Sequence, residues 1–276
     1  MTKVARPDIQ RAWVNVRRGT PAEALVLKSD WPVSKKLAPG EVLLKVHAAA
    51  LNPIGYKFFA VLPFFARRPR VPEYDLSGVV VDTNKTRFRE GDEVYGWVPS
   101  KQFRYKEGAL CQYVKVSEDW IVPRPHNVTP TQAAGLTLAG QTAYTALMRR
   151  INIQPGQHIF VNGGSTAVGA FAIQLAKIRG AKVTASASGR NEEFVRRMGA
   201  DKFVDYTKES VLEYMESFAR TSNSKFDYIL EAVGIRSLRP IVDSVYDFDD
   251  ALKAYDRIMS KRATGKVVVR VDTTSE

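Results

Sequence analysis

A glycine-rich turn between an apolar strand and a helix carries the clearest chemical signal in this sequence. The run from His158 to Gly169 reads HIFVNGGSTAVG. A helix that starts at such a turn points its first N–H groups and the positive end of its dipole at the ligand above it, which suits a pyrophosphate. Taken as G-x-G-x-x-G, the motif puts Gly164 at the tight turn and Thr166 where a second glycine normally admits the ligand. The backbone residues predicted to bind dinucleotide phosphates are Gly164, Ser165, Thr166, Ala167 and Val168. A glycine turn kept for packing alone is the alternative.

The end of the following strand indicates which nicotinamide cofactor would fit. An Asp or Glu about 20 residues beyond the glycine turn binds the ribose 2′-hydroxyl in sites for NAD. This chain has no acid there and instead reads Ser186-Ala-Ser188-Gly-Arg190. Hydroxyls and a guanidinium suit a 2′-phosphate, because Arg forks onto phosphate oxygens. The segment therefore predicts NADP(H), bound by Ser186, Ser188 and Arg190, although Arg190 could also be a solvated residue at a helix start.

Two kinds of secondary structure must position these residues. Residues 11–128 contain short apolar or alternating runs separated by Gly, Pro, Asn and Asp, which predict a β-rich barrel or sandwich. Thr129 and Pro130 then have the types expected at a helix start. From residue 157 onward apolar strands alternate with helical patterns, the βαβα rhythm of a parallel sheet with crossover helices. An amphipathic helix that ends near Gly265 and a short strand complete the chain.

Composition limits the classes of protein to consider. The chain has 276 residues, 45% hydrophobic and 25% charged, which predicts an ordinary soluble protein without a membrane span. Its one cysteine, Cys111, excludes an intramolecular disulfide framework and favours a reducing, cytoplasmic location. The basic, acid-poor start leaves mitochondrial import as the alternative. The formal charge of +12 comes from dispersed basic residues, so no nucleic-acid partner is expected.

Eight segments carry a resemblance to a known family. They read LNP (51–53), PEYDLSG (72–78), FREGDEVYGW (88–97), AGLTLAGQTAYTAL (134–147), INIQPGQHIFVNGGSTAVGAFAIQLAK (151–177), GADKFVDYT (199–207), FDYILEAVG (226–234) and ALKAYDRIMSKRATGKVVV (251–269). The chain resembles the medium-chain dehydrogenase/reductase superfamily, most closely its zinc-free, quinone oxidoreductase-like members with an enoyl reductase domain.

This resemblance implies an α/β fold of two domains. A GroES-like β-rich catalytic domain would cover residues 1–128, and a Rossmann domain with a doubly wound parallel sheet would cover 129–239. Residues 240–276 would return to the catalytic domain as a helix and a strand. NADP(H) would lie in the cleft between the two domains.

Individual roles also follow from the resemblance. Asn52 corresponds to an asparagine beside the nicotinamide ribose and the substrate carbonyl, and Thr142 to a residue near the nicotinamide. The positions that surround the 2′-phosphate in NADPH-using relatives are Ser188, Arg190 and Tyr206. Asp75 and Gly78 match a structural acid and a structural glycine.

The chain also departs from the family pattern in informative ways. Gly55 stands where relatives often have Asp, and Glu73 replaces a common glycine. Tyr74 occupies the place of the zinc-binding His, and neither a Cys after Leu51 nor a four-cysteine lobe is present. Carboxylates alone make a poor zinc site, so we predict a metal-free protein.

The chemistry that this implies is hydride transfer from the nicotinamide to a small-molecule acceptor, a quinone or an α,β-unsaturated carbonyl. The protein would supply orientation and hydrogen bonds to the oxygen that gains charge. We expect Asn52 and Tyr56 to provide those bonds and Lys57 to add positive charge. Surface helix packing is the alternative role for Tyr56 and Lys57.

The nucleotide-binding half is shorter than the family pattern requires. A doubly wound domain has six strands, whereas four are recognisable, at 158–162, 182–186, 202–206 and 226–233. The sequence then passes from Gly234 almost directly into the C-terminal tail, so about 60 residues, two βα units, are missing. Relatives use that segment to enclose the nicotinamide and to form homodimers, so dimerisation is doubtful here. A truncated, inactive isoform or gene-model product that retains at most nucleotide or partner binding is therefore the alternative function.

Overall fold

The computed structural model describes residues 6–55, 57, 68–99, 106–221 and 225–233, together with the backbone of 242–247 and 266–270. The chain divides into two compact units, Met1–Ala232 and Val233–Glu276. Tyr56 and the helix expected before Gly265 lie outside the described residues, and the predicted domain bounds remain predictions. No helix in the described part of the chain is long and apolar enough to cross a membrane.

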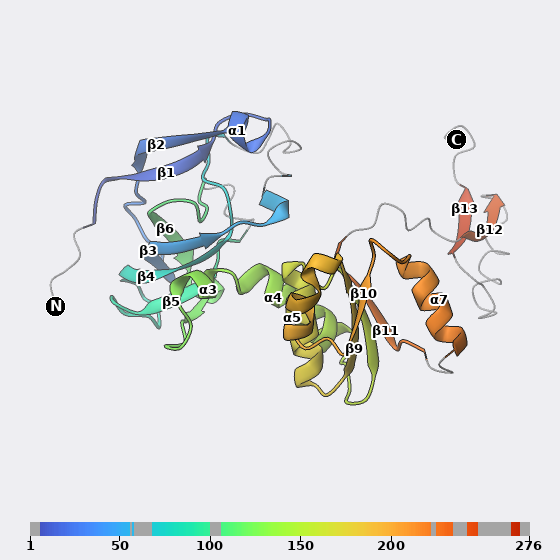
Figure 1. Cartoon of the computed structure of the whole chain (residues 1–276). Helices are drawn as coiled ribbons and strands as arrows, with labels where there is room; N and C mark the ends of the chain where they lie inside the picture. Colours follow the sequence, from blue (N-terminus) through green and yellow to red (C-terminus); the bar gives the residue numbers. More distant parts are fainter. Residues whose placement is uncertain are drawn as a thin grey trace. The chain divides into compact units, whose positions relative to one another are not determined.

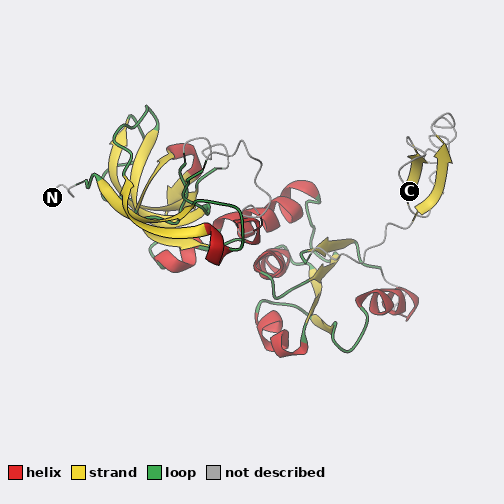
Figure 2. Cartoon of the chain, turned by 90° about the horizontal axis from the view of Figure 1, so that it is seen from above, coloured by secondary structure: helices red, strands yellow, loops and turns green. Residues whose placement is uncertain are grey.

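The first sheet is antiparallel and five-stranded, and it lies within the β-rich unit that the short runs of the N-terminal half predict. Its strand order is β6-β3-β4-β5-β7, and Figure 2 shows how strongly its strands curve. The bounds are β3 Glu41–Ala50, β4 Asp75–Asn84, β5 Glu93–Trp97, β6 Tyr113–Ser117 and β7 Ile121–Pro123. A separate antiparallel pair and a short helix precede this sheet: β1 Ile9–Asn15, α1 Pro21–Ala24 and β2 Leu25–Pro32.

Alternating apolar residues of this sheet form its core. Val42 and Leu44 of β3 are fully buried together with residues of the neighbouring strands, and Cys111 packs against the same cluster. Gly78 lies where β3 and β4 approach closely, because a Cβ there would be 2.3 Å from the Lys45 carbonyl oxygen. That geometry agrees with the structural role expected of Gly78.

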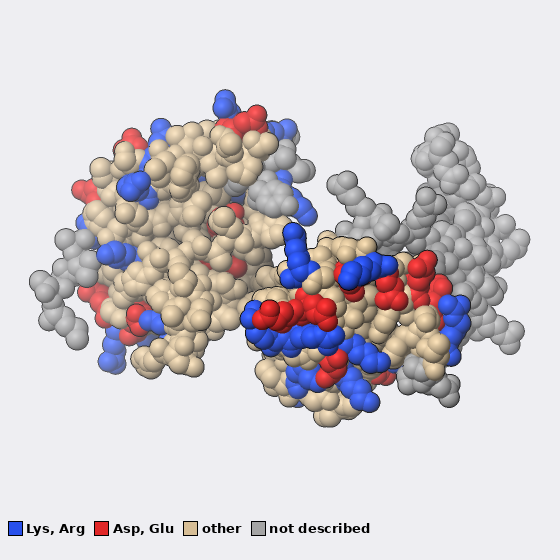
Figure 3. Space-filling model, viewed as in Figure 1, with Lys and Arg blue, Asp and Glu red and all other residues tan. Residues whose placement is uncertain are grey.

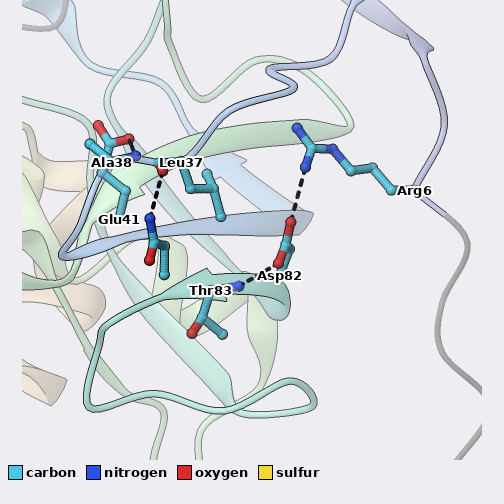
Figure 4. A network of polar contacts seen from close by, with 7 residues as sticks. Arg6, Leu37, Ala38, Glu41, Asp82 and Thr83 are labelled. Atoms are coloured by element: carbon cyan, nitrogen blue, oxygen red, sulfur yellow. Dashed lines mark hydrogen bonds and ion pairs between the residues drawn. The ribbon is translucent and has the colours of Figure 1, made fainter.

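Side chains at the ends of β3 and β4 fasten the preceding segments to the sheet (Figure 4). Arg6 forms an ion pair of 2.9 Å with Asp82, whose other carboxylate oxygen accepts the Thr83 N–H. The Glu41 carboxylate accepts the Ala38 N–H at 2.7 Å. The Glu41 contact closes the turn that leads into β3, and the Arg6 ion pair holds the segment before β1 against β4.

The second sheet has the predicted parallel strands. Its order is β10-β9-β8-β11, with bounds β8 His158–Asn162, β9 Lys182–Ala187, β10 Lys202–Asp205 and β11 Tyr228–Glu231. Helices α5 Ala167–Ile178, α6 Glu192–Arg197 and α7 Val211–Thr221 alternate with these strands. Figures 1 and 2 show α7 on the face of the sheet opposite α5. The chain therefore changes direction between β8 and β11, and ligands of such sheets bind at this switch point.

The last strand of this sheet has one partner in the described part of the chain. β11 pairs with β8 alone, and Ile229 on it is 57% exposed, so β11 is the edge strand that the shortened sequence predicts. In the second compact unit, β12 (Val242–Asp247) and β13 (Lys266–Arg270) pair in parallel with each other.

Helix α4 (Thr137–Tyr144) joins the two sheets of the first unit. It is preceded by α3 (Pro130–Ala134). Thr129 and Gln132 form a capping box at the N-terminus of α3, where the sequence predicts a helix start. α4 contacts β4 and β5 of the first sheet and packs along α5 beside the second. A π-helical segment, Thr145–Arg150, continues α4 toward β8.

Candidate functional site

The glycine turn after β8 has the shape expected of a phosphate-binding loop, shifted by one residue. Gly163 has a φ of +84°, in the left-handed region. Gly164, predicted to lie at the tight turn, lies within the same turn without a positive φ, so the left-handed conformation falls one residue earlier. Gly169 allows the helix to approach the loop, because a Cβ there would lie 2.2 Å from the Gly163 carbonyl oxygen.

Thr166 is the N-cap of helix α5, and its side-chain hydroxyl makes its hydrogen bonds within the loop. Its hydroxyl accepts the Gly169 N–H at 3.0 Å and donates to the Gly163 carbonyl at 2.8 Å. Among the described residues, no protein acceptor receives the N–H groups of Ala167 and Val168. These two donors lie at the positive end of α5 and are available to an anionic group, as expected for dinucleotide phosphates.

Ser186 supports the loop from beneath and does not reach a ligand. It is fully buried, its hydroxyl donates to the Asn162 side chain, and it accepts the Gly163 N–H at 3.2 Å. Asn162 in turn donates to Glu231 at 2.7 Å. The prediction that Ser186 binds the cofactor is therefore corrected: burial at the end of β9 makes it part of a polar chain across three strand ends.

A cavity of about 600 Å³ lies where β9 and β10 end. The two strands run parallel, with Asp205 beside Ala187, so the residues that follow them meet. All three residues predicted around a 2′-phosphate line this cavity, and Lys208 joins them. The lining residues are Ser188, Gly189, Arg190, Asp205, Tyr206, Thr207 and Lys208. Lys208 escaped the sequence analysis, although its position two residues after Tyr206 could have indicated it.

Asp205 is the one carboxylate that lines this cavity, and one of its oxygens, Oδ1, is used by the neighbouring loops. It accepts the Gly189 N–H at 3.0 Å, the Thr207 N–H at 3.0 Å and the Thr207 hydroxyl at 2.7 Å. The hydrogen bond from the Thr207 hydroxyl is the main reason that the pKa of Asp205 is lowered. Asp205 therefore braces two loops through Oδ1, while its Oδ2 lies 3.8 Å from the Lys208 ammonium.

A second polar group surrounds Asn52, directly after β3. The Asn52 amide donates to Asp75 at 3.0 Å, and the Asp75 carboxylate also accepts the Leu138 N–H in the first turn of α4 at 3.2 Å and 3.3 Å. Asp75 is 1% exposed, and burial raises its pKa to about 6. One carboxylate thus fixes both Asn52 and the helix that carries Thr142.

The orientation of Asn52 changes the role expected for it. Its Nδ2 group donates to Asp75 and, at 3.5 Å, to the Ala50 carbonyl. The amide therefore presents Oδ1, an acceptor, which suits a ribose hydroxyl better than an oxygen that gains negative charge. Thr142 lines a different cavity, of about 450 Å³, with Gln141 and Arg150. Lys57 is exposed, and Tyr56 lies outside the described residues.

The two departures from the family pattern meet beside Asn52. The Glu73 carboxylate accepts the Asn52 backbone N–H at 3.3 Å. A Cβ added to Gly55 would lie 2.1 Å from Oε1 of Glu73. The side chain of Glu73 therefore occupies the space into which a residue at position 55 would project.

Comparison with known proteins connects this geometry to a family. The model of the alcohol dehydrogenase GroES-like domain matches residues 38–126, and models of the zinc-binding dehydrogenase match 167–248 and 235–269. The 2-methylene-furan-3-one reductase of Solanum lycopersicum is 31% identical over 97% of this chain and 81% of its own length. The chain belongs to the medium-chain dehydrogenase/reductase family.

Two further members of this medium-chain family are informative. The chloroplastic NADPH-dependent alkenal/one oxidoreductase of Arabidopsis thaliana is 38% identical over 83% of this chain and 58% of its own length. The solved structure of the quinone oxidoreductase from Coxiella burnetii shares the fold, with a TM-score of 0.68, 23% identity and coverage of 96% of this chain and all of that one. The alignment with the Solanum lycopersicum protein extends over 319 residues, more than the 276 of this chain, so this chain has gaps in the alignment.

The donor groups at the zinc position of this medium-chain protein do not fit zinc. Tyr74 is buried with its ring 6.2 Å from that of Trp97, and burial raises the pKa of its hydroxyl. The described residues contain no group of three or more His, Cys, Asp or Glu side chains that could hold a metal ion. Elsewhere, basic and acidic side chains are interspersed on the face drawn in Figure 3, without a single-sign patch.

Proposed function

We propose that this protein is an NADPH-dependent reductase of a quinone or an α,β-unsaturated carbonyl that works without zinc. The observation that carries the cofactor assignment is the cavity after β9 and β10. Arg190, Lys208 and the Ser188 hydroxyl supply positive charge and donors there, while Oδ1 of Asp205 is taken by Gly189 and Thr207 and its Oδ2 faces Lys208. A 2′-phosphate gains more from two cations than a ribose hydroxyl does.

The substrate class is supported by the relatives. The tomato protein is named a reductase of a methylene-furanone, and the Arabidopsis protein an NADPH-dependent oxidoreductase of alkenals and alkenones. A trans-enoyl reductase of Aspergillus terreus is 27% identical over 98% of both chains. These names share an electron-poor carbon–carbon double bond conjugated to a carbonyl, which accepts hydride at the β-carbon.

Each described part of the site has a defined task in this proposal. Bound NADPH supplies the hydride. The N–H groups of Ala167 and Val168 hold the pyrophosphate, and Arg190, Ser188 and Lys208 hold the 2′-phosphate. Asn52 accepts a hydrogen bond from the nicotinamide ribose and thereby orients the ring, while Asp75 fixes the Asn52 amide and the start of α4. The proton that completes the reduction comes from solvent.

Cofactor binding tests the first half of the proposal. NADPH and NADH are titrated into the protein, and binding is followed by cofactor fluorescence. We expect NADPH to bind at least about 10-fold more tightly, and R190A to weaken NADPH about 10-fold without changing NADH, because one charge-assisted contact to the phosphate is lost. R196A is the matched control, since Arg196 pairs with Glu192 on α6 away from the cavity. Tighter binding of NADH would overturn the cofactor assignment.

Turnover tests the second half. NADPH oxidation is measured with a panel of quinones, enones and saturated ketones. We expect oxidation with the first two classes only. The alternative is a shortened chain that binds nucleotide without catalysis, and it is favoured because β11 has one partner strand, β8, within the described residues. It predicts tight NADPH binding with no turnover on any acceptor.

A further inference from the structure

The backbone at Glu73 has a conformation that side chains rarely adopt. Its φ is +66°, a left-handed region that favours glycine and costs other residues free energy. Neighbouring hydrogen bonds hold it there: the Ala109 N–H donates to the Glu73 carbonyl at 3.0 Å, and the Val98 N–H donates to the Tyr74 carbonyl at 2.8 Å. A glycine would satisfy this backbone better, so the glutamate side chain must contribute something else.

The carboxylate of Glu73 is almost completely buried next to the site. The residue is 6% exposed, and burial raises the pKa of its carboxyl. Oε2 accepts the Asn52 N–H at 3.3 Å, while Asp75 accepts from the side chain of the same residue. Residues 73 and 75 therefore clamp Asn52 from two directions, one through its backbone and one through its amide.

Gly55 makes room for that carboxylate. A Cβ at position 55 would lie 2.1 Å from Oε1 of Glu73 and 2.7 Å from Cδ, far inside van der Waals contact. Gly55 has no positive φ, so the conformation of its own backbone does not demand glycine. Its lack of a side chain is explained by the space that Glu73 fills, and a carboxylate carried by residue 55 would project into the same space.

We propose that Glu73 is a positioning residue for Asn52 and that Glu73 and Gly55 form an interchangeable pair, in which one carboxylate can reach the Asn52 turn from either position. The role of Asn52 rests on the proposed function, whereas the pairing of Glu73 with Gly55 does not. The proposal predicts a sign reversal: an acid at position 55 is harmful when residue 73 is Glu and beneficial when residue 73 is Gly.

Four proteins test this: the wild type, E73G, G55D and E73G/G55D. We expect E73G to lose about 10- to 100-fold in kcat with a KM for NADPH that changes by less than about 3-fold, because a loosened positioning group affects the reaction more than binding. G55D should lower Tm by about 5 °C or more, since the new side chain collides with Glu73. The double variant should regain kcat to within about 5-fold of the wild type, with Tm at or above that of the wild type.

Two further variants separate the carboxylate from other effects. E73Q keeps an acceptor for the Asn52 N–H and should retain most of kcat. K85G is the matched control for backbone strain, because Lys85 is exposed and also left-handed, with φ of +51°; it should leave kcat unchanged.

The outcomes distinguish this inference from the proposed function. Effects of E73G and G55D on Tm that simply add would refute the pair, and this readout needs no activity. Coupled Tm effects without any loss of kcat in E73G would refute the positioning role. A wild type that lacks turnover on every acceptor would refute the proposed function alone, and the Tm cycle would still decide the pair.

Discussion

Replacement of Asp75 by Asn should remove a specific pH dependence of stability. Burial raises the pKa of Asp75 from its usual 3.8 to about 6, so the folded protein holds this proton more tightly than the unfolded chain does. Between those two pH values the folded state carries the extra proton, and stability therefore decreases as the pH rises. The stabilisation is fully present near pH 3.8 and is lost by the time the pH exceeds about 6. At about 1.4 kcal/mol per pKa unit, the change amounts to about 3 kcal/mol.

Urea unfolding of the wild type and D75N at several pH values measures the pH-dependent contribution of Asp75 to the free energy of unfolding. Other titrating groups contribute equally to both proteins, so the difference in free energy of unfolding isolates Asp75. We expect D75N to gain about 3 kcal/mol relative to the wild type between pH 3.5 and pH 7. A carboxyl ¹³C resonance that titrates near pH 6 and disappears in D75N would identify the group directly. A difference that stays constant within about 1 kcal/mol would refute the argument from burial.

Three more substitutions test other parts of the fold. G163A should lower the free energy of unfolding in urea by about 1–2 kcal/mol and abolish tight NADPH binding, because Gly163 adopts a left-handed conformation. The control G156A, with φ of +82° and open space around it, should destabilise the protein similarly and bind NADPH normally. Normal NADPH binding by G163A would contradict the assignment of the phosphate-binding loop. Burial lowers the pKa of His158 below its usual 6.5, so this residue should contribute a loss of thermal stability as the pH falls below about 6.5. Tm should therefore fall less, or rise more, in H158Q than in the wild type over this pH range, and equal slopes of Tm against pH would count against this. I229K on the edge strand β11 should reduce self-association in light scattering with Tm nearly unchanged, and unchanged association would show that another surface is responsible.

The fold was largely predictable because its signals are local. Alternating strands before Pro130 and the βαβα rhythm after residue 157 predict both sheets, and the capping types at Thr129 and Pro130 mark the right helix start. The exposed edge at β11 also follows from counting strands. Pairing order within the first sheet did not follow, because short antiparallel strands with similar apolar patterns leave their neighbours undetermined.

The candidate site was only partly predictable, because several of its features depend on contacts distant in sequence. Arg190 and Tyr206 could be placed together only through the family pattern, and parallel pairing of β9 with β10 brings them into one cavity. Ser186 looked like a ligand-binding hydroxyl by type, yet its burial beneath the loop gives it a structural role. The meeting of Gly55 and Glu73 was not foreseeable, since eighteen positions separate two residues that each looked like an isolated exception.

The surroundings of Cys111 have a consequence for a protein that handles electrophiles. Quinones and enones alkylate exposed thiolates by Michael addition. The only sulfhydryl of this chain lies against the Gly108 and Tyr113 carbonyl oxygens, at 3.3 Å and 3.1 Å, and burial raises its pKa so that it remains a neutral thiol. Under the proposed function, quinones and enones would meet no thiolate in this chain, and the protein should tolerate repeated exposure to them without covalent self-inactivation.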